Sequence, residues 1–168
     1  MTRIWRIVSD DKSGLDVLID EEEAEEMDNR ESEPLLHRET TEIILRAFYD
    51  VYNGLGYGFL EKVYENSLAL KLRHTGLKVM TQCPIRVYFE GSLVGEYFAD
   101  LIINETVLIE IKAAESLRRE HEAQLTNYLK ATPIEVGLLL NFGPRPEFSR
   151  KVFMNRRKPH LTHKSNPS

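Results

Sequence analysis

The 168-residue sequence contains a single cysteine, Cys83. One thiol cannot form a disulfide within the chain, and it cannot supply the cysteine ligands of a structural zinc site. No pattern of catalytic partners surrounds Cys83, so we expect it to pack as a small apolar side chain. The cysteine content therefore excludes disulfide-stabilised scaffolds and cysteine-based zinc domains within one chain.

Long hydrophobic runs are also absent. The longest apolar stretches fall far short of the roughly 18 residues that a membrane-spanning helix requires. The N-terminal MTRIWRIVSDDK interrupts its few apolar residues with arginine, unlike the core of a signal peptide. The composition, 42% hydrophobic and 29% charged, is ordinary for a soluble protein. We expect an intracellular protein with no membrane partner and with one domain plus terminal segments.

Charge is distributed unevenly along the chain. Residues 1–33 hold 4 basic and 12 acidic side chains (net −8), residues 34–143 hold 11 and 14 (net −3), and residues 144–168 hold 7 and 1 (net +6). The segment DEEEAEEMDNRESEP cannot bury enough apolar surface to fold alone. We therefore expect an acidic, disordered arm (1–34) in which short apolar pieces can dock as strands, a folded domain (35–154), and a basic, disordered tail (155–168). The tail fits either a flexible terminus or a contact with phosphates.

Hydrophobic periodicity predicts the elements of the folded region. Turn residues, such as Asn53-Gly54 and Glu90-Gly91-Ser92, separate them. The predicted helices span residues 39–53, 59–74 and 120–131, and the predicted strands span residues 78–89, 94–103, 107–112 and 135–142, with a further strand through Val152. This order indicates an α/β fold with a mixed central sheet of about four strands, flanked by helices that include an extra N-terminal helix.

Three charged residues, Asp100, Glu110 and Lys112, interrupt the apolar strands of the stretch FADLIINETVLIEIKAAES. Burying an unpaired charge is costly, so charges in such a setting usually have partners or a metal ion. A three-residue loop at 104–106 would place Asp100 opposite Glu110, whereas a two-residue loop would place it opposite Ile109 unless a bulge restored the phase. The register of the hairpin therefore tests whether the charges converge.

Converging carboxylates repel each other, and a divalent cation is the usual remedy. Ligation by oxygen alone suits magnesium or manganese better than zinc or copper. Beside a metal-bound water, Lys112 would hold the water for attack and stabilise negative charge on a phosphoryl oxygen. By spacing alone, a carboxylate paired with lysine on a half-exposed sheet explains the pattern as well.

A family resemblance favours the first of these interpretations. GFLEKVY, with Gly58, Glu61 and Tyr64, resembles the signature of the GxxExxY protein family, a branch of the PD-(D/E)xK nuclease superfamily. EYFADLIINETVLIEIKA is similar to the central hairpin of that superfamily, and HEAQLTNYLKAT with VGLLLNFG is similar to its next helix and strand. The resemblance covers about residues 39–143 and implies a restriction-endonuclease-like core. Ala99 replaces the proline of the superfamily name, which is not a ligand.

The resemblance also implies a set of site residues. Asp100, Glu110 and the carbonyl of Ile111 correspond to the ligands of Mg²⁺ or Mn²⁺, and Lys112 corresponds to the catalytic lysine. Glu61 matches the helix carboxylate that such enzymes place near the metal, as a ligand or through water. One turn away, Glu65 is an alternative source of that carboxylate, although as an exposed charge it needs no explanation.

Two further residues are implied to contact nucleic acid. Gln124 and Tyr128 resemble the Gln-x-x-x-Tyr element of RecB-like nucleases, which lines the active site and contacts DNA. The alternative interpretation of the same two residues is a helix surface with a half-buried tyrosine.

The sequence therefore predicts a metal-dependent nuclease that hydrolyses phosphodiester bonds in nucleic acid, with DNA the expected partner and RNA an alternative. A nuclease-like fold that binds nucleic acid or a protein partner without cleaving is the second hypothesis, because fold alone does not fix function. The complete set of an aspartate, Glu-x-Lys and a helix glutamate favours retained chemistry. A structural network of salt bridges is a third, weaker hypothesis.

Overall fold

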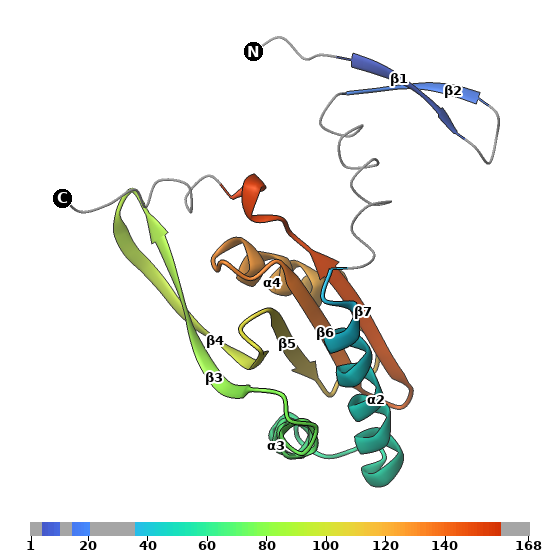
Figure 1. The fold of residues 1–168 in the computed structure, drawn as a ribbon, viewed down its shortest axis with the longest axis vertical. Coiled ribbons are helices and arrows are strands. Elements are labelled where there is room, and N and C mark those ends of the chain that lie inside the picture. The colour runs from blue at the N-terminus through green and yellow to red at the C-terminus, as the bar shows by residue number, and fades with distance from the viewer. Residues whose placement is uncertain (1–4, 11–14, 21–35, 159–168) are drawn as a thin grey trace. The chain divides into compact units, whose positions relative to one another are not determined.

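The computed structural model of the protein describes residues 5–10, 15–20 and 36–158 (Figure 1). The chain divides into two units, Met1–Leu36 and His37–Ser168. In the first unit, β1 (Trp5–Asp10) and β2 (Leu15–Asp20) pair with each other in an antiparallel hairpin. The apolar pieces before the acidic run thus form strands. The disorder predicted for residues 21–34 and 159–168 concerns positions outside the described ranges.

The second unit contains helices and strands in the predicted order. Its elements are α2 (Arg38–Leu55), α3 (Glu61–Arg73), β3 (Val79–Phe89), β4 (Ser92–Ile103), β5 (Val107–Lys112), α4 (Arg119–Lys130), β6 (Val136–Phe142) and β7 (Pro146–Val152). The sheet order is β3-β4-β5-β6-β7, in which β5 and β6 are parallel and the other neighbours are antiparallel. The mixed α/β sheet is confirmed. It has five strands because β7 pairs along the whole of β6.

Helices cover both faces of the sheet. On one face, Phe142 of β6 contacts Phe48 of α2 and Tyr64 of α3, with ring centroids 4.8 and 4.3 Å apart. On the other face, Gly137 of β6 lies against Leu125 of α4. All seven residues of β6 are buried, as expected for a strand with a helix layer on each side. None of the helices in the described ranges has the length and hydrophobicity needed to span a membrane.

The packed region continues to Lys158, beyond the predicted domain boundary at residue 154. After a short 3-10 helix (Asn155–Arg157), the Lys158 side chain is fully buried. Its Nζ donates to the carbonyls of Thr132 and Ile134 at 2.9 and 2.7 Å. The apolar stem and these two acceptors allow the lysine to be buried although the surrounding sequence is basic.

Candidate active site

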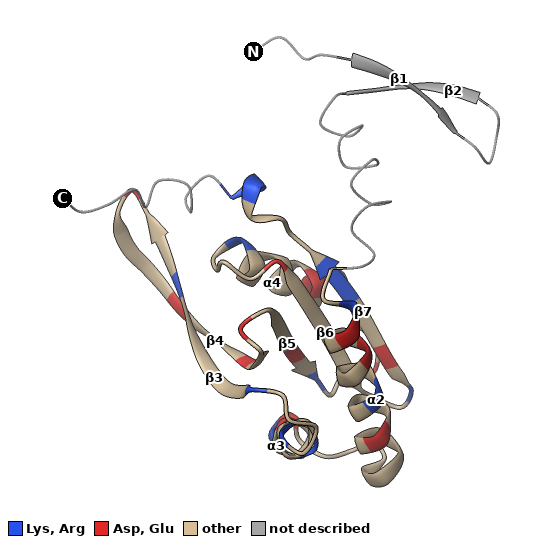
Figure 2. Cartoon of the chain, viewed as in Figure 1, with Lys and Arg blue, Asp and Glu red and all other residues tan. Residues whose placement is uncertain are grey.

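The hairpin of β4 and β5 has the register that brings the predicted residues together. The last three pairs are Leu101 with Ile109, Ile102 with Leu108 and Ile103 with Val107, which leaves a three-residue loop, as the functional interpretation requires. The ladder ends at Leu101 and Ile109. Beyond that point β4 leaves β5, and acidic positions interrupt both strands in the middle of the sheet (Figure 2).

Asp100 and Glu110 join the two strands where the ladder ends. The backbone N–H of Asp100 donates to Glu110 Oε1 at 3.3 Å, and the backbone N–H of Ile111 donates to Asp100 Oδ2 at 2.7 Å. Side-chain carboxylates thus accept hydrogen bonds from backbone groups that the strand ladder no longer pairs. Both carboxylates are held at the point where the sheet opens.

Burial makes this pair of carboxylates hard to ionise. Burial first, and the neighbouring Asp100 second, raise the pKa of Glu110 from 4.5 to about 8. The pKa of Asp100 is also raised, mainly by burial and then by Glu65 and Glu61, while the hydrogen bond from the Ile111 N–H opposes the rise. Lys112 lowers both pKa values but does not cancel the rise. The site therefore favours either a proton or a cation between these oxygens.

Lys112 at the end of β5 lies next to the two residues predicted on the later helix. Its Nζ donates to Gln124 Oε1 at 2.9 Å, and Gln124 Nε2 donates to the Tyr128 hydroxyl at 2.8 Å. Tyr128 is only 6% exposed and packs against the ring of Tyr97, with centroids 5.7 Å apart. The structure thus brings Lys112, Gln124 and Tyr128 into one hydrogen-bonded chain beside the carboxylates.

The backbone that follows Lys112 is fixed from β6. The buried side chain of Asn141 accepts from the Ala114 N–H at 2.9 Å and donates to the Ala114 carbonyl at 3.0 Å. Gly143 leaves room for that carbonyl, because a Cβ at this position would lie 2.2 Å from the Ala114 oxygen. These contacts hold the exit of β5, and with it the position of Lys112.

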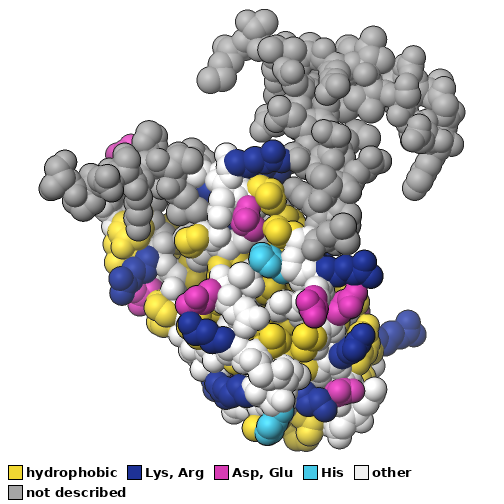
Figure 3. Space-filling model, viewed as in Figure 1, with side chains coloured by type: hydrophobic (Ala, Val, Ile, Leu, Met, Phe, Trp, Pro, Cys, Tyr) yellow, Lys and Arg dark blue, Asp and Glu magenta, His cyan; other side chains and the backbone are white. Residues whose placement is uncertain are grey.

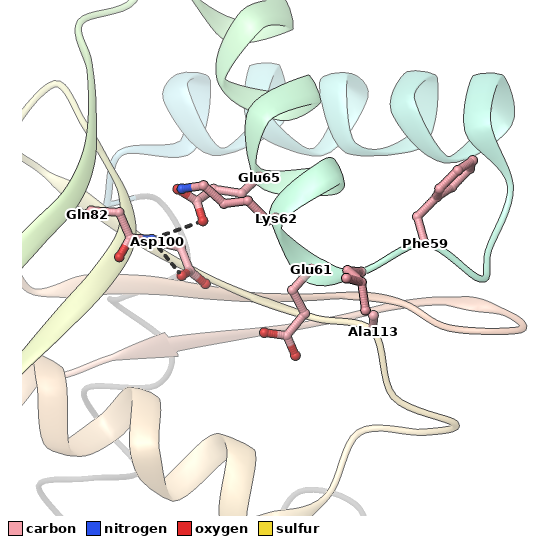
Figure 4. Close-up of a pocket in the computed structure, with 8 residues that line it drawn as sticks. Phe59, Glu61, Lys62, Glu65, Gln82, Asp100 and Ala113 are labelled. Carbon is pink, nitrogen blue, oxygen red and sulfur yellow. Dashed lines mark hydrogen bonds and ion pairs between the residues drawn. The ribbon is translucent and has the colours of Figure 1, made fainter.

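Helix α3 contributes two carboxylates to the same region, those of Glu61 and Glu65. Glu61, the first residue of α3, is exposed, whereas Glu65 is buried with 4% exposure, contrary to the expectation of an exposed charge. Glu65 accepts from Lys62 Nζ and Gln82 Nε2, both at 2.9 Å, and Gln82 Nε2 also reaches Asp100 Oδ1 at 3.4 Å. In Figure 4, Glu61 and Glu65 extend in different directions from the helix.

A pocket of about 560 Å³ opens between α3 and the end of the β4–β5 ladder (Figure 4). It is lined by Phe59, Leu60, Glu61, Lys62, Glu65, Gln82, Asp100 and Ala113. The predicted helix carboxylate Glu61 and the strand carboxylate Asp100 therefore share one pocket. This pocket is large enough for a small group such as a phosphate with its bound ion and water.

Tyr64 and Gly58, the tyrosine and glycine of the GFLEKVY motif, both have structural roles. The ring of Tyr64 is fully buried, and its hydroxyl donates to the Gly56 carbonyl at 2.8 Å and accepts from the Phe59 N–H at 3.2 Å. Gly58, with φ of 110°, adopts a conformation that side chains disfavour. Tyr64 thus packs between α3 and the sheet and fixes the loop that leads into Glu61.

The donor set fits a hard divalent ion in part. Asp100 and Glu110 offer oxygen ligands, which suit Mg²⁺ or Mn²⁺. Burial raises the pKa values of both carboxyl groups, and a bound cation would lower these pKa values. Within the described part of the chain, no three histidine, cysteine or acidic side chains are already grouped as a metal-ligand cluster. The fit therefore rests on the Asp100–Glu110 pair, and Glu61 and the Ile111 carbonyl stay predictions.

Two residues of the site were not predicted from the sequence, Gln82 and Asn141. Gln82 sits in a strand-like run with no distinguishing pattern, and its place opposite Asp100 depends on a bulge between Val87 and Tyr88. Asn141 is the one polar residue in the apolar run VGLLLNF. A polar residue in a fully buried strand usually has a specific hydrogen-bond partner, so its structural role could have been predicted.

Comparison with known proteins gives a family match over the domain that contains these residues. A family model of the PD-(D/E)XK nuclease superfamily matches residues 38–152, which includes every element from α2 to β7. Among solved structures, "Crystal structure of SSO0001" is similar, with 22% sequence identity and a TM-score of 0.45. The similarity covers 55% of this chain and 50% of that chain, so the chain spans about half the length of the matched one. No curated protein matches the chain.

Proposed function

The chain belongs to the PD-(D/E)XK nuclease superfamily, and we propose that it is a metal-dependent nuclease that hydrolyses phosphodiester bonds in nucleic acid, DNA in the first place. The observation that carries the proposal is the convergence of Asp100, Glu110 and Lys112 at the point where β4 leaves β5. Buried carboxylates beside a lysine provide both a cation site and a positive group for a phosphoryl oxygen.

We also propose that the chain belongs to the GxxExxY family within that superfamily. The assignment is supported by Gly58, Glu61 and Tyr64, which occupy the spacing of the motif at the start of α3. In this chain each has a physical reason, since Gly58 permits the loop, Tyr64 holds it, and Glu61 is presented to the pocket.

In the proposed site, Asp100, Glu110 and the carbonyl of Ile111 hold Mg²⁺ or Mn²⁺, and Glu61 contributes from α3 directly or through water. When bound, the ion would activate a water and neutralise charge on the phosphate. Lys112 would orient the attacking water and stabilise negative charge on the phosphoryl oxygen. Gln124 holds the Lys112 ammonium through its 2.9 Å hydrogen bond. The partly exposed Gln124 would also contact the nucleic acid strand, with the hydroxyl of the buried Tyr128 holding its amide.

The surface gives a second expectation about binding. On the face shown in Figure 3, basic and acidic side chains lie next to one another and do not form a continuous basic surface. Across this face we therefore expect affinity for nucleic acid to depend on contacts near the pocket and on the metal more than on a general positive potential. Without metal we expect weak binding that falls further as salt is added.

Calorimetric titration with Mg²⁺ or Mn²⁺ tests the proposal, together with cleavage assays on single-stranded, double-stranded and branched DNA and on RNA. We expect binding and cleavage by the wild type and neither by Asp100→Asn with Glu110→Gln, which should stay folded by circular dichroism. Glu105→Gln, an exposed turn variant, is the matched control and should behave as the wild type. Metal binding without cleavage of any substrate would overturn the proposed nuclease activity and favour a nuclease-like domain that binds without cleaving.

A further inference from the structure

Gln82 interrupts strand β3 with a left-handed backbone conformation, φ 49°. The regular pairs on either side are Thr81 with Leu101 and Cys83 with Ala99, which leaves Gln82 opposite Asp100. Elsewhere in the described ranges, non-glycine residues with positive φ precede α2 or form the turns that follow β3 and β4. Gln82 therefore adopts an unfavourable conformation at a place where the chain makes no turn.

The side chain of Gln82 connects two carboxylates that come from different elements. Its Nε2 donates to Glu65 Oε2 on α3 at 2.9 Å and to Asp100 Oδ1 on β4 at 3.4 Å, as the dashed lines in Figure 4 show. Glycine would adopt the same backbone conformation without strain, but it has no amide to offer. The backbone conformation alone would favour glycine, so the presence of glutamine points to a role for its side-chain amide.

Each of these carboxylates has its second oxygen fixed elsewhere. Asp100 Oδ2 accepts from the Ile111 N–H at 2.7 Å, and Glu65 Oε1 accepts from Lys62 Nζ at 2.9 Å. Gln82 donates to the remaining oxygen of each carboxylate and so fixes the orientation of the two carboxylates relative to each other. An amide does this without adding charge, whereas an ammonium here would compete with a metal ion for Asp100.

We propose that Gln82 is a positioning residue of the nuclease site, which holds Asp100 in the orientation that binds the metal by linking it to Glu65 of α3. This inference rests on the proposed function. It assigns a role to the buried Glu65 as well, as the anchor of Gln82.

Gln82→Gly is the decisive variant, because it removes the amide and relieves the backbone strain. Glu90→Gly is the matched control, since Glu90 has φ of 48° in the exposed turn after β3, remote from Asp100 in the strand pairing. For each protein we would measure the Mn²⁺ dissociation constant by calorimetry, kcat and KM on the cleaved substrate, and the melting temperature. Glu65→Met, alone and with Gln82→Gly, tests the link.

If Gln82 positions Asp100, Gln82→Gly weakens Mn²⁺ binding and lowers kcat, each by about 10-fold or more, as loss of residues that orient metal ligands generally does. KM and the melting temperature stay near those of the wild type, and Glu90→Gly changes neither constant. Glu65→Met weakens Mn²⁺ binding on its own but causes no further loss of affinity when it is combined with Gln82→Gly.

Three other outcomes overturn the inference and are distinguishable. Wild-type Mn²⁺ affinity and kcat in Gln82→Gly would show that only the backbone kink matters. Additive losses in Glu65→Met with Gln82→Gly would show that the two residues act separately. A wild type that neither binds Mn²⁺ nor cleaves any substrate would overturn the proposed function and this inference with it.

Discussion

Asp100 and Glu110 are connected through the backbone where their strands part: the Asp100 N–H donates to Glu110 Oε1 at 3.3 Å, and the Ile111 N–H next to Glu110 donates to Asp100 Oδ2 at 2.7 Å. The two carboxylates are therefore fixed by the end of a strand ladder and do not depend on flexible loops. Their raised pKa values follow from the same arrangement, because burial and proximity both disfavour a second negative charge.

This arrangement predicts an unusual pH dependence in metal-free protein. The pKa of Glu110 is about 8 in the folded state and 4.5 without burial, so between these values the folded state binds more protons than the unfolded state. The free energy of unfolding should therefore fall as pH rises from 4.5 to 8, by up to about 1.4 kcal/mol per pH unit, and level off above pH 8. The raised pKa of Asp100 acts in the same direction.

Glu110→Gln tests that assignment in urea unfolding at pH 5 and pH 8. It should remove most of the slope and make the metal-free protein more stable than the wild type at pH 8. Glu105→Gln should keep the slope, since Lys78 lowers the pKa of Glu105 below this range. In the wild type, Mg²⁺ should raise the melting temperature more at pH 8 than at pH 5, because protons compete with the ion. Equal stabilisation at both pH values contradicts the proposed ligands.

Lys112 and Gln124 should act as a unit in cleavage. Lys112→Met keeps the length of the side chain but removes the charge, and we expect kcat to fall by about 10²- to 10³-fold with metal affinity retained. Gln124→Met removes the acceptor of the 2.9 Å hydrogen bond and should cost about 10-fold, with little further loss when combined with Lys112→Met.

Single-turnover rates at saturating Mg²⁺ measure both variants, and Lys78→Met is the control. Lys78 is an exposed lysine paired with Glu105 on the surface, so its loss should leave the rate unchanged. Losses in Lys112→Met and Gln124→Met that multiply in the double variant would mean that Gln124 contributes to the reaction rate independently of Lys112.

Gly143 should tolerate no side chain. A Cβ at this position would lie 2.2 Å from the backbone oxygen of Ala114 and 2.9 Å from Asn141 Nδ2, so the chain after β5 would have to move. We expect Gly143→Ala to lower the free energy of unfolding by about 2–3 kcal/mol and to reduce kcat, since Lys112 ends the same strand.

Gly54→Ala is the matched control for that substitution. Gly54 lies near the end of α2, where an added Cβ meets nothing within 4 Å, and alanine favours a helix. Denaturant unfolding of the two variants should therefore give changes of opposite sign, or no change for Gly54→Ala. An undisturbed Gly143→Ala would show that the loop of Ala114 is free to shift.

Much of this fold was accessible from the sequence because local patterns and tertiary structure agree. Apolar periodicity located every element from α2 to β6, and the three residues Asn104, Glu105 and Thr106 set the hairpin register. Asn104 and Glu105 both adopt positive φ, which a short loop requires and asparagine tolerates. From the sequence the loop could have two or three residues, and the observed three-residue loop brings Asp100 beside Glu110.

The rest of the site depends on tertiary irregularities with no local signal. The bulge between Val87 and Tyr88 shifts the pairing of β3 by one residue, and only this shift leaves Gln82 opposite Asp100. Glu65 was expected to be an exposed charge, because helical periodicity cannot show that Gln82 of β3 will contact it. The burial of Lys158 likewise needs the carbonyls of Thr132 and Ile134, remote in sequence.

Tyr64 gives the last prediction, which separates the packing of the helix motif from its chemistry. Tyr64→Phe keeps the ring that stacks on Phe142 but removes the hydroxyl that pairs with the Gly56 carbonyl and the Phe59 N–H. These part-buried groups then lack a partner, which should cost about 1–2 kcal/mol of unfolding free energy. The loosened loop should also lower kcat, because Glu61 begins α3 directly after it. Tyr57→Phe, 63% exposed in the same loop, is the control and should change neither quantity. A kcat that falls in Tyr64→Phe without any loss of stability would instead mean that the hydroxyl takes part in the reaction.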